Sequence, residues 1–350
     1  MHLNFYLICA LEDMHNKLEN NSIIMIYKKD ILGNDSDIIC KKLRSLTKNN
    51  YIKLPKYISF KIDNNTLEVY LQEQSNCENK VVEIMQDDNA TFEGWSVVLK
   101  AWLKEIEIVV LKWDIPSKMV LKEKTHYNRF LYRVIRMLDS YSWFKIDASL
   151  KNEVENFKNG LTDLEINFGT KDPVKKLKHG GEYGENAVEY DMVHSLKKNM
   201  CDHYNIDVIN HQLPVGIKKA GEQFFSSYQA AIDIYGYKAN EFTLIELKYK
   251  KNNKVGIISE LFLYTQIIKD LIRGVISTPK VKGSRNNDFF SICKDIKNIH
   301  ARMLADTFHP LLMNQAVFDI LNNCKQDDIL IDYNKSSYIF SISPETLVFI

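Results

Sequence analysis

Two neighbouring β-rich segments constrain the fold of this chain more than any other feature of its sequence. The stretch "AIDIYGYKANEFTLIELKYK", residues 231–250, has runs of apolar, β-branched and aromatic residues on either side of Ala239 and Asn240. Asparagine tolerates the positive φ that a two-residue hairpin loop needs, so we expect an antiparallel hairpin with its loop at these residues. Both strands carry charged residues, which are costly in a packed sheet unless another group pairs with them.

The register of this hairpin brings the charged residues together. Pairing about the loop sets Asp233 directly opposite Glu246, with Cβ atoms about 5 Å apart. Lys248 lies two residues beyond Glu246 and therefore on the same face of its strand. Two carboxylates this close repel each other unless a cation lies between them, and a hard divalent cation with oxygen ligands fits best.

The spacing of Glu246 and Lys248 is weak evidence when taken alone. An acidic residue two positions before a lysine should occur about five times by chance in a chain of this composition. It occurs at Glu78, Asp295 and Glu246. Of these, Glu246 alone lies in a strong β pattern, follows a strand that bears an aspartate and precedes an apolar helical segment. The alternative is a solvated hairpin face that carries the triplet by coincidence.

Length and composition limit the class of protein. A chain of 350 residues is long for one core, so two domains are expected. The net charge of +1 provides no global attraction for nucleic acid or membrane, so a local patch would have to supply it. No apolar run is long enough to span a bilayer, and we expect no membrane partner. Six cysteines without a CxxC pair predict reduced thiols in a cytoplasmic protein.

The patterns divide the chain into three parts. Residues 1–165 are expected to form an α+β domain, with a first strand at 1–13, a hairpin in "YISFKIDNNTLEVYLQ" and a helix in "HYNRFLYRVIRMLDSY". A loop or linker rich in glycine and lysine occupies residues 166–184. Residues 185–350 form the second domain, which begins with a helical pattern over 185–204 and continues with three strand segments, a buried helix and further strand.

This second domain resembles the core of the PD-(D/E)xK nuclease superfamily. The resemblance rests on Asp233 in "AIDIYGY", on Glu246 and Lys248 in "LIELK", and on the order helix, strand, strand, strand, helix. It covers about residues 185–342, and Ile232 stands where the motif has its proline. The implied fold is an α/β restriction-endonuclease-like core, a mixed sheet flanked by helices, with its next strand in "IHARMLADTFHPLL".

The resemblance also implies roles for individual residues. Asp233, Glu246 and the backbone carbonyl of Leu247 would bind Mg²⁺, with Mn²⁺ as a substitute. Lys248 would orient or activate the attacking water and stabilise developing negative charge. These roles suit phosphodiester hydrolysis, which needs a nucleophile made from water and charge stabilisation on the phosphate.

Other residues are weaker candidates. Glu189 or, less well, Glu185 would supply a carboxylate from the first helix, and a solvated helix position is the alternative for Glu189. Tyr264 and Gln266 on the buried helix are candidates for contact with substrate. His309 is expected to be a structural histidine near a strand end rather than a metal ligand.

Basic residues around the core form a candidate nucleic-acid surface, with solubility as the alternative explanation. The lysines are Lys218, Lys219, Lys250, Lys251 and Lys254. In the first domain Arg129, Arg133 and Arg136 fall on one stripe of the expected helix, where a solvated face is the alternative to DNA contact.

The sequence therefore predicts a cytoplasmic, Mg²⁺-dependent nuclease with DNA as its favoured substrate. Its N-terminal domain would recognise substrate or partner, and restriction or defence against foreign DNA is an extension of this reading. A homodimer or a partner subunit of a larger system is possible. The alternative is a non-catalytic nucleic-acid-binding module with the same fold.

Overall fold

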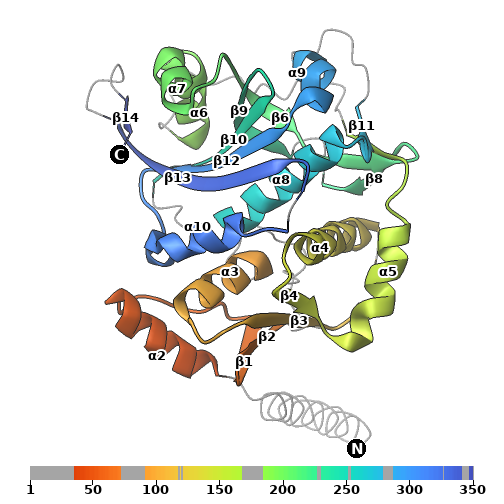
Figure 1. Cartoon of the computed structure of the whole chain (residues 1–350), viewed down its shortest axis with the longest axis vertical. Coiled ribbons are helices and arrows are strands. Elements are labelled where there is room, and N and C mark those ends of the chain that lie inside the picture. The colour runs from red at the N-terminus through yellow and green to blue at the C-terminus, as the bar shows by residue number, and fades with distance from the viewer. Residues whose placement is uncertain are drawn as a thin grey trace, which may run out of the picture.

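The computed structural model describes residues 35–71, 91–116, 119, 121–167, 184–226, 230–250, 254–278, 287–325, 327–340 and 347–349. These residues form a mixed α+β structure in which several mixed sheets are flanked by helices (Figure 1). The strand expected at residues 1–13 and most of the expected linker at 166–184 lie outside the described residues.

The N-terminal part contains a four-stranded sheet in the order β1-β2-β3-β4. Its strands β1 and β2 pair antiparallel about a turn in which Asn64 has a φ of 54°, which confirms the expected hairpin. The helix expected over 126–141 is confirmed as part of α4. The strands are β1 (Ile58–Asp63), β2 (Thr66–Leu71), β3 (Ile108–Trp113) and β4 (Phe144–Ile146). The helices are α2 (Ser36–Thr47), α3 (Phe92–Trp102), α4 (Leu121–Ser140) and α5 (Lys151–Asn159).

The C-terminal part is built on a six-stranded sheet in the order β14-β13-β12-β10-β9-β6. Strand β9 is antiparallel to both β6 and β10, whereas β10, β12 and β13 run parallel to one another. The strand expected after the buried helix is confirmed as β12, and the expected break near Pro214 is the end of β6. The strands are β6 (Val208–Pro214), β9 (Ala231–Lys238), β10 (Glu241–Lys248), β12 (Asn298–Ala305), β13 (Leu330–Phe340) and β14 (Leu347–Phe349).

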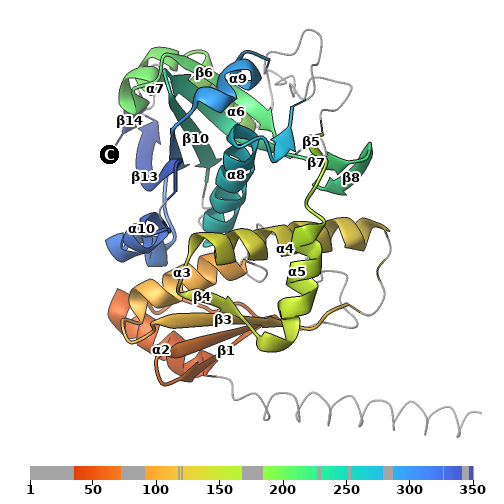
Figure 2. The same ribbon diagram turned by 45° about the vertical axis from the view of Figure 1, so that its right-hand side comes forward.

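Helices cover both faces of the six-stranded sheet. Helices α6 (Glu185–Val193) and α7 (Lys197–Tyr204) pack on the face that carries Ile245 and Leu247. On the other face, α8 (Ile257–Ile272) lies between the sheet and helices α3 and α4 (Figure 2). As expected for a helix enclosed on all sides, α8 is buried along almost its whole length.

The helical pattern over 185–204 forms two helices, because the chain turns at residues 194–196. The apolar residues that predicted the helix are nevertheless all buried in one small core. They are Val188, Met192, Leu196 and Met200. The turn keeps these side chains on the same core, so their spacing does not reveal the interruption.

A further four-stranded sheet joins the two parts of the chain, with β5 from the first part beside three strands from the second. Its strands are β11 (Ile276–Ser277), β5 (Leu164–Ile166), β7 (Ile217–Lys219) and β8 (Glu222–Phe225). The remaining α-helices among the described residues are α9 (Asn287–Ile292) and α10 (Gln315–Asn322).

The N-terminal helices pack closely against the start of α8. At Gly94 in α3 a Cβ atom would lie 2.8 Å from the carbonyl oxygen of Val255, so only glycine permits this approach. One hydrophobic core cluster accordingly extends from Ile39 to Tyr333. The position of α8 therefore depends on the N-terminal part, and the division of the chain into domains at 166–184 stays a prediction.

None of the helices in the described part of the chain is long and apolar enough to cross a membrane. The four cysteines within the described residues are free thiols. They are Cys40, Cys201, Cys293 and Cys324.

Candidate active site

The β9–β10 hairpin has the expected register. The ladder of paired residues runs from Glu241 opposite Lys238 to Ile245 opposite Ile234. The loop lies at the expected position, and the residue with positive φ is Ala239, at 50°. The ladder ends at the pair Ile245–Ile234, so the direct pairing of Asp233 with Glu246 stays a prediction.

The two strands are joined differently beyond Ile245. There the backbone N–H of Leu247 donates a hydrogen bond of 2.9 Å to Oδ2 of Asp233, so the Asp233 side chain bridges the strands. In an antiparallel pair the N–H and C=O of one residue face the same neighbour, and the Leu247 carbonyl therefore faces the Asp233 side. Asp233 and this carbonyl thus share one edge of β10.

Lys248 lies between two buried carboxylates. Its Nζ atom is 2.5 Å from Oε1 of Glu246 and 3.1 Å from Oε2 of Glu260 on α8. Glu246 is 2% exposed and Glu260 is 1% exposed. We call Asp233, Glu246, Lys248 and Glu260 the carboxylate–lysine cluster.

One oxygen of this cluster lacks a partner. Oε2 of Glu246 is buried and has no hydrogen-bond partner among the described residues. Buried polar atoms are nearly always satisfied in folded proteins, so an exception marks a place where a water, ion or substrate binds. The cluster has three carboxylates and one ammonium group, and Arg129 on α4 is a further cation that interacts with Glu260.

The titration of these groups reflects their burial. Burial raises the pKa of Asp233 to about 7. The positive charge of Lys248 lowers this pKa, and the negative charge of Glu189 raises it further. Burial and the neighbouring Asp233 and Glu260 also raise the pKa of Glu246 well above its usual range. For Lys248, burial alone would lower the pKa, but the surrounding carboxylates outweigh it and raise the value. The cluster therefore favours a bound cation or protons on its carboxyl groups.

Glu189 borders the cluster and is held by β6. Its two oxygens each accept a hydrogen bond of 2.9 Å from Nε2 of Gln212, and its Oε1 is 3.0 Å from Nδ1 of His211. Glu189 is only 4% exposed, so the alternative of a solvated helix residue is wrong. Glu185 lies nearby, where its Oε2 accepts a hydrogen bond of 3.2 Å from the Tyr249 N–H.

Gln212, which is half-buried beside the site, has a strained backbone. Its φ is 56°, a left-handed conformation that is unfavourable for a non-glycine residue within a strand. The β6–β9 register places it opposite Asp233, between the pairs His211–Ile234 and Leu213–Ile232. Such strain clusters at functional sites. Here it accompanies the contact between the Gln212 amide and Glu189.

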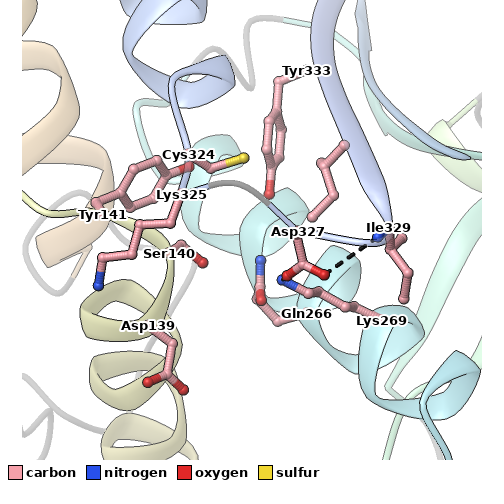
Figure 3. Close-up of a pocket in the computed structure, with 11 residues that line it drawn as sticks. Asp139, Ser140, Tyr141, Gln266, Lys269, Cys324, Lys325, Asp327, Ile329 and Tyr333 are labelled. Atoms are coloured by element: carbon pink, nitrogen blue, oxygen red, sulfur yellow. Dashed lines mark hydrogen bonds and ion pairs between the residues drawn. The ribbon is translucent and has the colours of Figure 1, made fainter.

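The two candidates on α8 differ in their surroundings. Burial, Glu246 and Glu260 raise the pKa of Tyr264, which places this ring beside the cluster. Gln266 instead borders a cavity of about 180 Å³ that contains no member of the cluster (Figure 3). The other residues that line it are Asp139, Ser140, Tyr141, Lys269, Cys324, Lys325, Asp327, Ile329, Ile331 and Tyr333.

At Arg133 both alternatives for the arginine stripe are wrong, because this side chain neither faces solvent nor is available to contact DNA. Arg133 is 1% exposed and makes a two-pronged ion pair with Glu93 inside the protein. Arg136 pairs with Asp270 at 2.6 Å. Arg129 is partly buried, and burial lowers its pKa to about 10. A helical pattern cannot distinguish an exposed basic stripe from one that packs against acidic partners.

The lysines have mixed surroundings. Lys218 is 3.4 Å from Glu165, and Lys219 donates a hydrogen bond to the Gly160 carbonyl. Lys250 and Lys254 are exposed, whereas Lys251 lies outside the described residues.

His309 is a structural residue. Its Nδ1 atom accepts a hydrogen bond of 3.2 Å from the Leu311 N–H, and burial lowers its pKa to about 4.

Sequence reasoning missed Glu260, His211 and Gln212. A usable signal existed for Glu260, which is the only charged residue in the apolar run 257–268. A lone charge in a buried helix needs a partner. For His211 and Gln212 the sequence offers no comparable signal.

The donor set suits a hard cation, because Mg²⁺ prefers carboxylate oxygens as ligands and Oε2 of Glu246 is buried with no hydrogen-bond partner in the part of the chain that the structure describes. Within the described ranges, no group of three or more His, Cys, Asp or Glu side chains is arranged to hold a metal ion. Comparisons with protein-family models, curated proteins and solved structures found no match to the chain.

The raised pKa of Asp233 predicts a pH effect on stability. Between pH 3.8, the ordinary pKa, and about 7, the folded protein keeps a proton that the unfolded chain has released. The free energy of unfolding should therefore fall as pH rises through this window. Asp233→Asn should reduce that slope and be more stable than the wild type at pH 8 without divalent metal. Urea unfolding at pH 5 to 8 in the presence of a chelator measures the free energy of unfolding of both proteins. Equal slopes against pH in the wild type and the variant would contradict the prediction.

Proposed function

We propose that the protein is a metal-dependent nuclease that hydrolyses phosphodiester bonds of DNA. The observation that carries the proposal is the buried Oε2 of Glu246, which has no hydrogen-bond partner among the described residues. Lys248 lies beside it on β10 and Asp233 lies on the adjacent strand β9. In a cluster with a purely structural role, we would expect each carboxylate to have a cationic or hydrogen-bonding partner within the protein. Buried carboxylates in excess of their cationic partners instead suit a site that binds a divalent cation.

The element order supports a restriction-endonuclease-like core. Helices α6 and α7 precede β6, β9 and β10, which are followed by α8 and β12. With α6 and α7 in place of one helix, this is the order helix, strand, strand, strand, helix, strand that the resemblance to PD-(D/E)xK nucleases implies. Strands β7, β8 and β11, which belong to another sheet, and helix α9 are inserted between these elements. The charged residues lie at the end of β10 and near the start of β9, so they meet at one end of the sheet.

Each residue of the site would have a distinct task. Asp233, Glu246 and the Leu247 carbonyl would hold Mg²⁺ or Mn²⁺. Bound metal would lower the pKa of a water molecule and polarise a phosphoryl oxygen. Lys248 would orient the attacking water and stabilise negative charge on the phosphate. Glu189, fixed by β6, would accept a hydrogen bond from water at the same site or add a ligand.

The wider role follows from the same chemistry. The exposed Lys250 and Lys254 lie just beyond β10, where they would contact the DNA backbone. We assign the N-terminal part to recognition of DNA or of a partner subunit. Restriction or defence against foreign DNA in the cytoplasm is the corresponding cellular role, and action as a homodimer is compatible with it.

The test is direct incubation of the purified protein with supercoiled plasmid, linear DNA and RNA. We expect cleavage of DNA with Mg²⁺ or Mn²⁺ and none with a chelator. If the wild type hydrolyses none of these substrates with either metal but binds them, the protein is a non-catalytic nucleic-acid-binding module.

A further inference from the structure

Helix α8 supplies a second carboxylate to Lys248. Oε2 of Glu260 lies 3.1 Å from the Lys248 ammonium, which also lies 2.5 Å from Oε1 of Glu246. Both carboxylates are almost fully buried, and the Lys248 side chain is 12% exposed. A buried ammonium with two carboxylate partners is confined much more narrowly than one with a single partner.

If the protein has the proposed function, Lys248 and the metal ion compete for the same carboxylate, that of Glu246. Glu246 is needed for a cation, yet one of its oxygens is already paired with the lysine. A divalent cation at Glu246 would compete with the ammonium for this carboxylate and repel it. Without another anionic partner, the lysine would leave the position from which it can reach a phosphate.

We propose that Glu260 is a positioning residue that holds the Lys248 ammonium in the site when Glu246 binds a cation. The inference rests on the proposed function and adds a residue to it. Glu260 acts through Lys248, and one of its oxygens is committed to that contact. Its place on α8 keeps it separate from the hairpin that carries Asp233 and Glu246.

The N-terminal part fixes the position of Glu260. The adjacent Ser259 donates a hydrogen bond of 2.8 Å to Oε2 of Glu93, the carboxylate that pairs with Arg133. Ser259 also contacts Thr91 through its hydroxyl. Two neighbouring residues of α8 thus contact different parts of the protein. Ser259 contacts Glu93 and Thr91 at the start of α3, and Glu260 contacts Lys248 on β10. The helix therefore supplies an anionic partner for the Lys248 ammonium that does not depend on Glu246.

Activity provides the first readout. Glu260→Gln keeps the shape and removes the charge, so kcat should fall about tenfold or more with KM nearly unchanged. Glu260→Asp should recover part of the loss. In a Lys248→Met background, Glu260→Gln should cause no further loss, because the group that it positions is absent. An additional loss of Mn²⁺ affinity in that background would overturn the proposal, since Glu260 would then act as a metal ligand.

A second readout does not require cleavage. The pKa of Lys248 can be followed by NMR after reductive ¹³C-methylation of lysines, with Lys248→Met to assign the signal. The charged or titratable groups around Glu260 are Lys248 and Glu246 on β10, Arg129 on α4 and Tyr264 on α8. Loss of the Glu260 charge should lower the Lys248 pKa by about one unit or more.

Asp270→Asn is the matched control. Asp270 is another buried carboxylate of α8, but it accepts hydrogen bonds from Tyr132 and Arg136, both at 2.6 Å, away from the cluster. This variant should leave the Lys248 pKa unchanged. A Lys248 pKa that Glu260→Gln does not move would overturn the proposal even in an active nuclease. A shifted pKa in a wild type that cleaves nothing would support the pairing and contradict the nuclease function instead.

Discussion

Asp233→Ala should reduce DNA cleavage by about 10³-fold or more, because loss of a metal ligand removes several kcal/mol of transition-state stabilisation. DNA binding should stay near the wild-type level, since the variant also loses a negative charge that faces the phosphate backbone. Initial rates of plasmid cleavage and fluorescence anisotropy with a labelled duplex measure the two effects separately.

Asp202→Ala is a suitable control for this variant, because Asp202 is an exposed carboxylate on α7. It should change neither rate nor affinity measurably. Cleavage by Asp233→Ala at more than a tenth of the wild-type rate would show that this carboxylate does not bind the essential metal.

Lys248→Met should lower kcat about 10²-fold or more, which is the usual scale for a preorganised electrostatic group. DNA binding should weaken only slightly, because one phosphate contact among several changes the salt dependence by about one unit. Lys248→Arg should restore little activity, since a planar guanidinium cannot replace a compact ammonium between Glu246 and Glu260. Single-turnover cleavage and a salt titration of binding give the two quantities.

Lys250→Met is the control for charge alone. Lys250 is exposed two residues beyond Lys248, so its replacement should affect binding and leave kcat unchanged. Equal losses of kcat in the two variants would mean that Lys248 is only part of a basic surface.

The sequence predicted the hairpin because its determinants are local. Alternating apolar residues and a two-residue loop fix both strands and their register, and the pairs from Glu241–Lys238 to Ile245–Ile234 confirm it. The buried helix α8 and strand β12 were also found, because long apolar runs identify buried elements. The period of a strand then places Glu246 and Lys248 on one face, whereas Asp233 contacts β10 through the hydrogen bond that it accepts from the Leu247 N–H.

What the sequence could not provide are contacts between distant segments. Glu260 contacts Lys248 because α8 packs on β10, and Gln212, which has a positive φ, donates a hydrogen bond to Glu189 from a different element. Arg133 was placed on a surface because its partner Glu93 lies on a different helix. Periodicity identifies which residues share a face of an element, but not which element covers that face.

The central place of β10 has a consequence for synthesis of the chain. Its neighbour β12 begins at Asn298, and β13, the next strand of the parallel set, ends at Phe340. Parallel pairing of this kind depends on contacts between residues far apart in sequence, which form late. Glu246 and Lys248 therefore leave the ribosome long before the strands that enclose them. A nascent chain that ends before β12 lacks the neighbour that covers one edge of β10, so we expect the carboxylate–lysine cluster to take up its arrangement only after β12 has been synthesised.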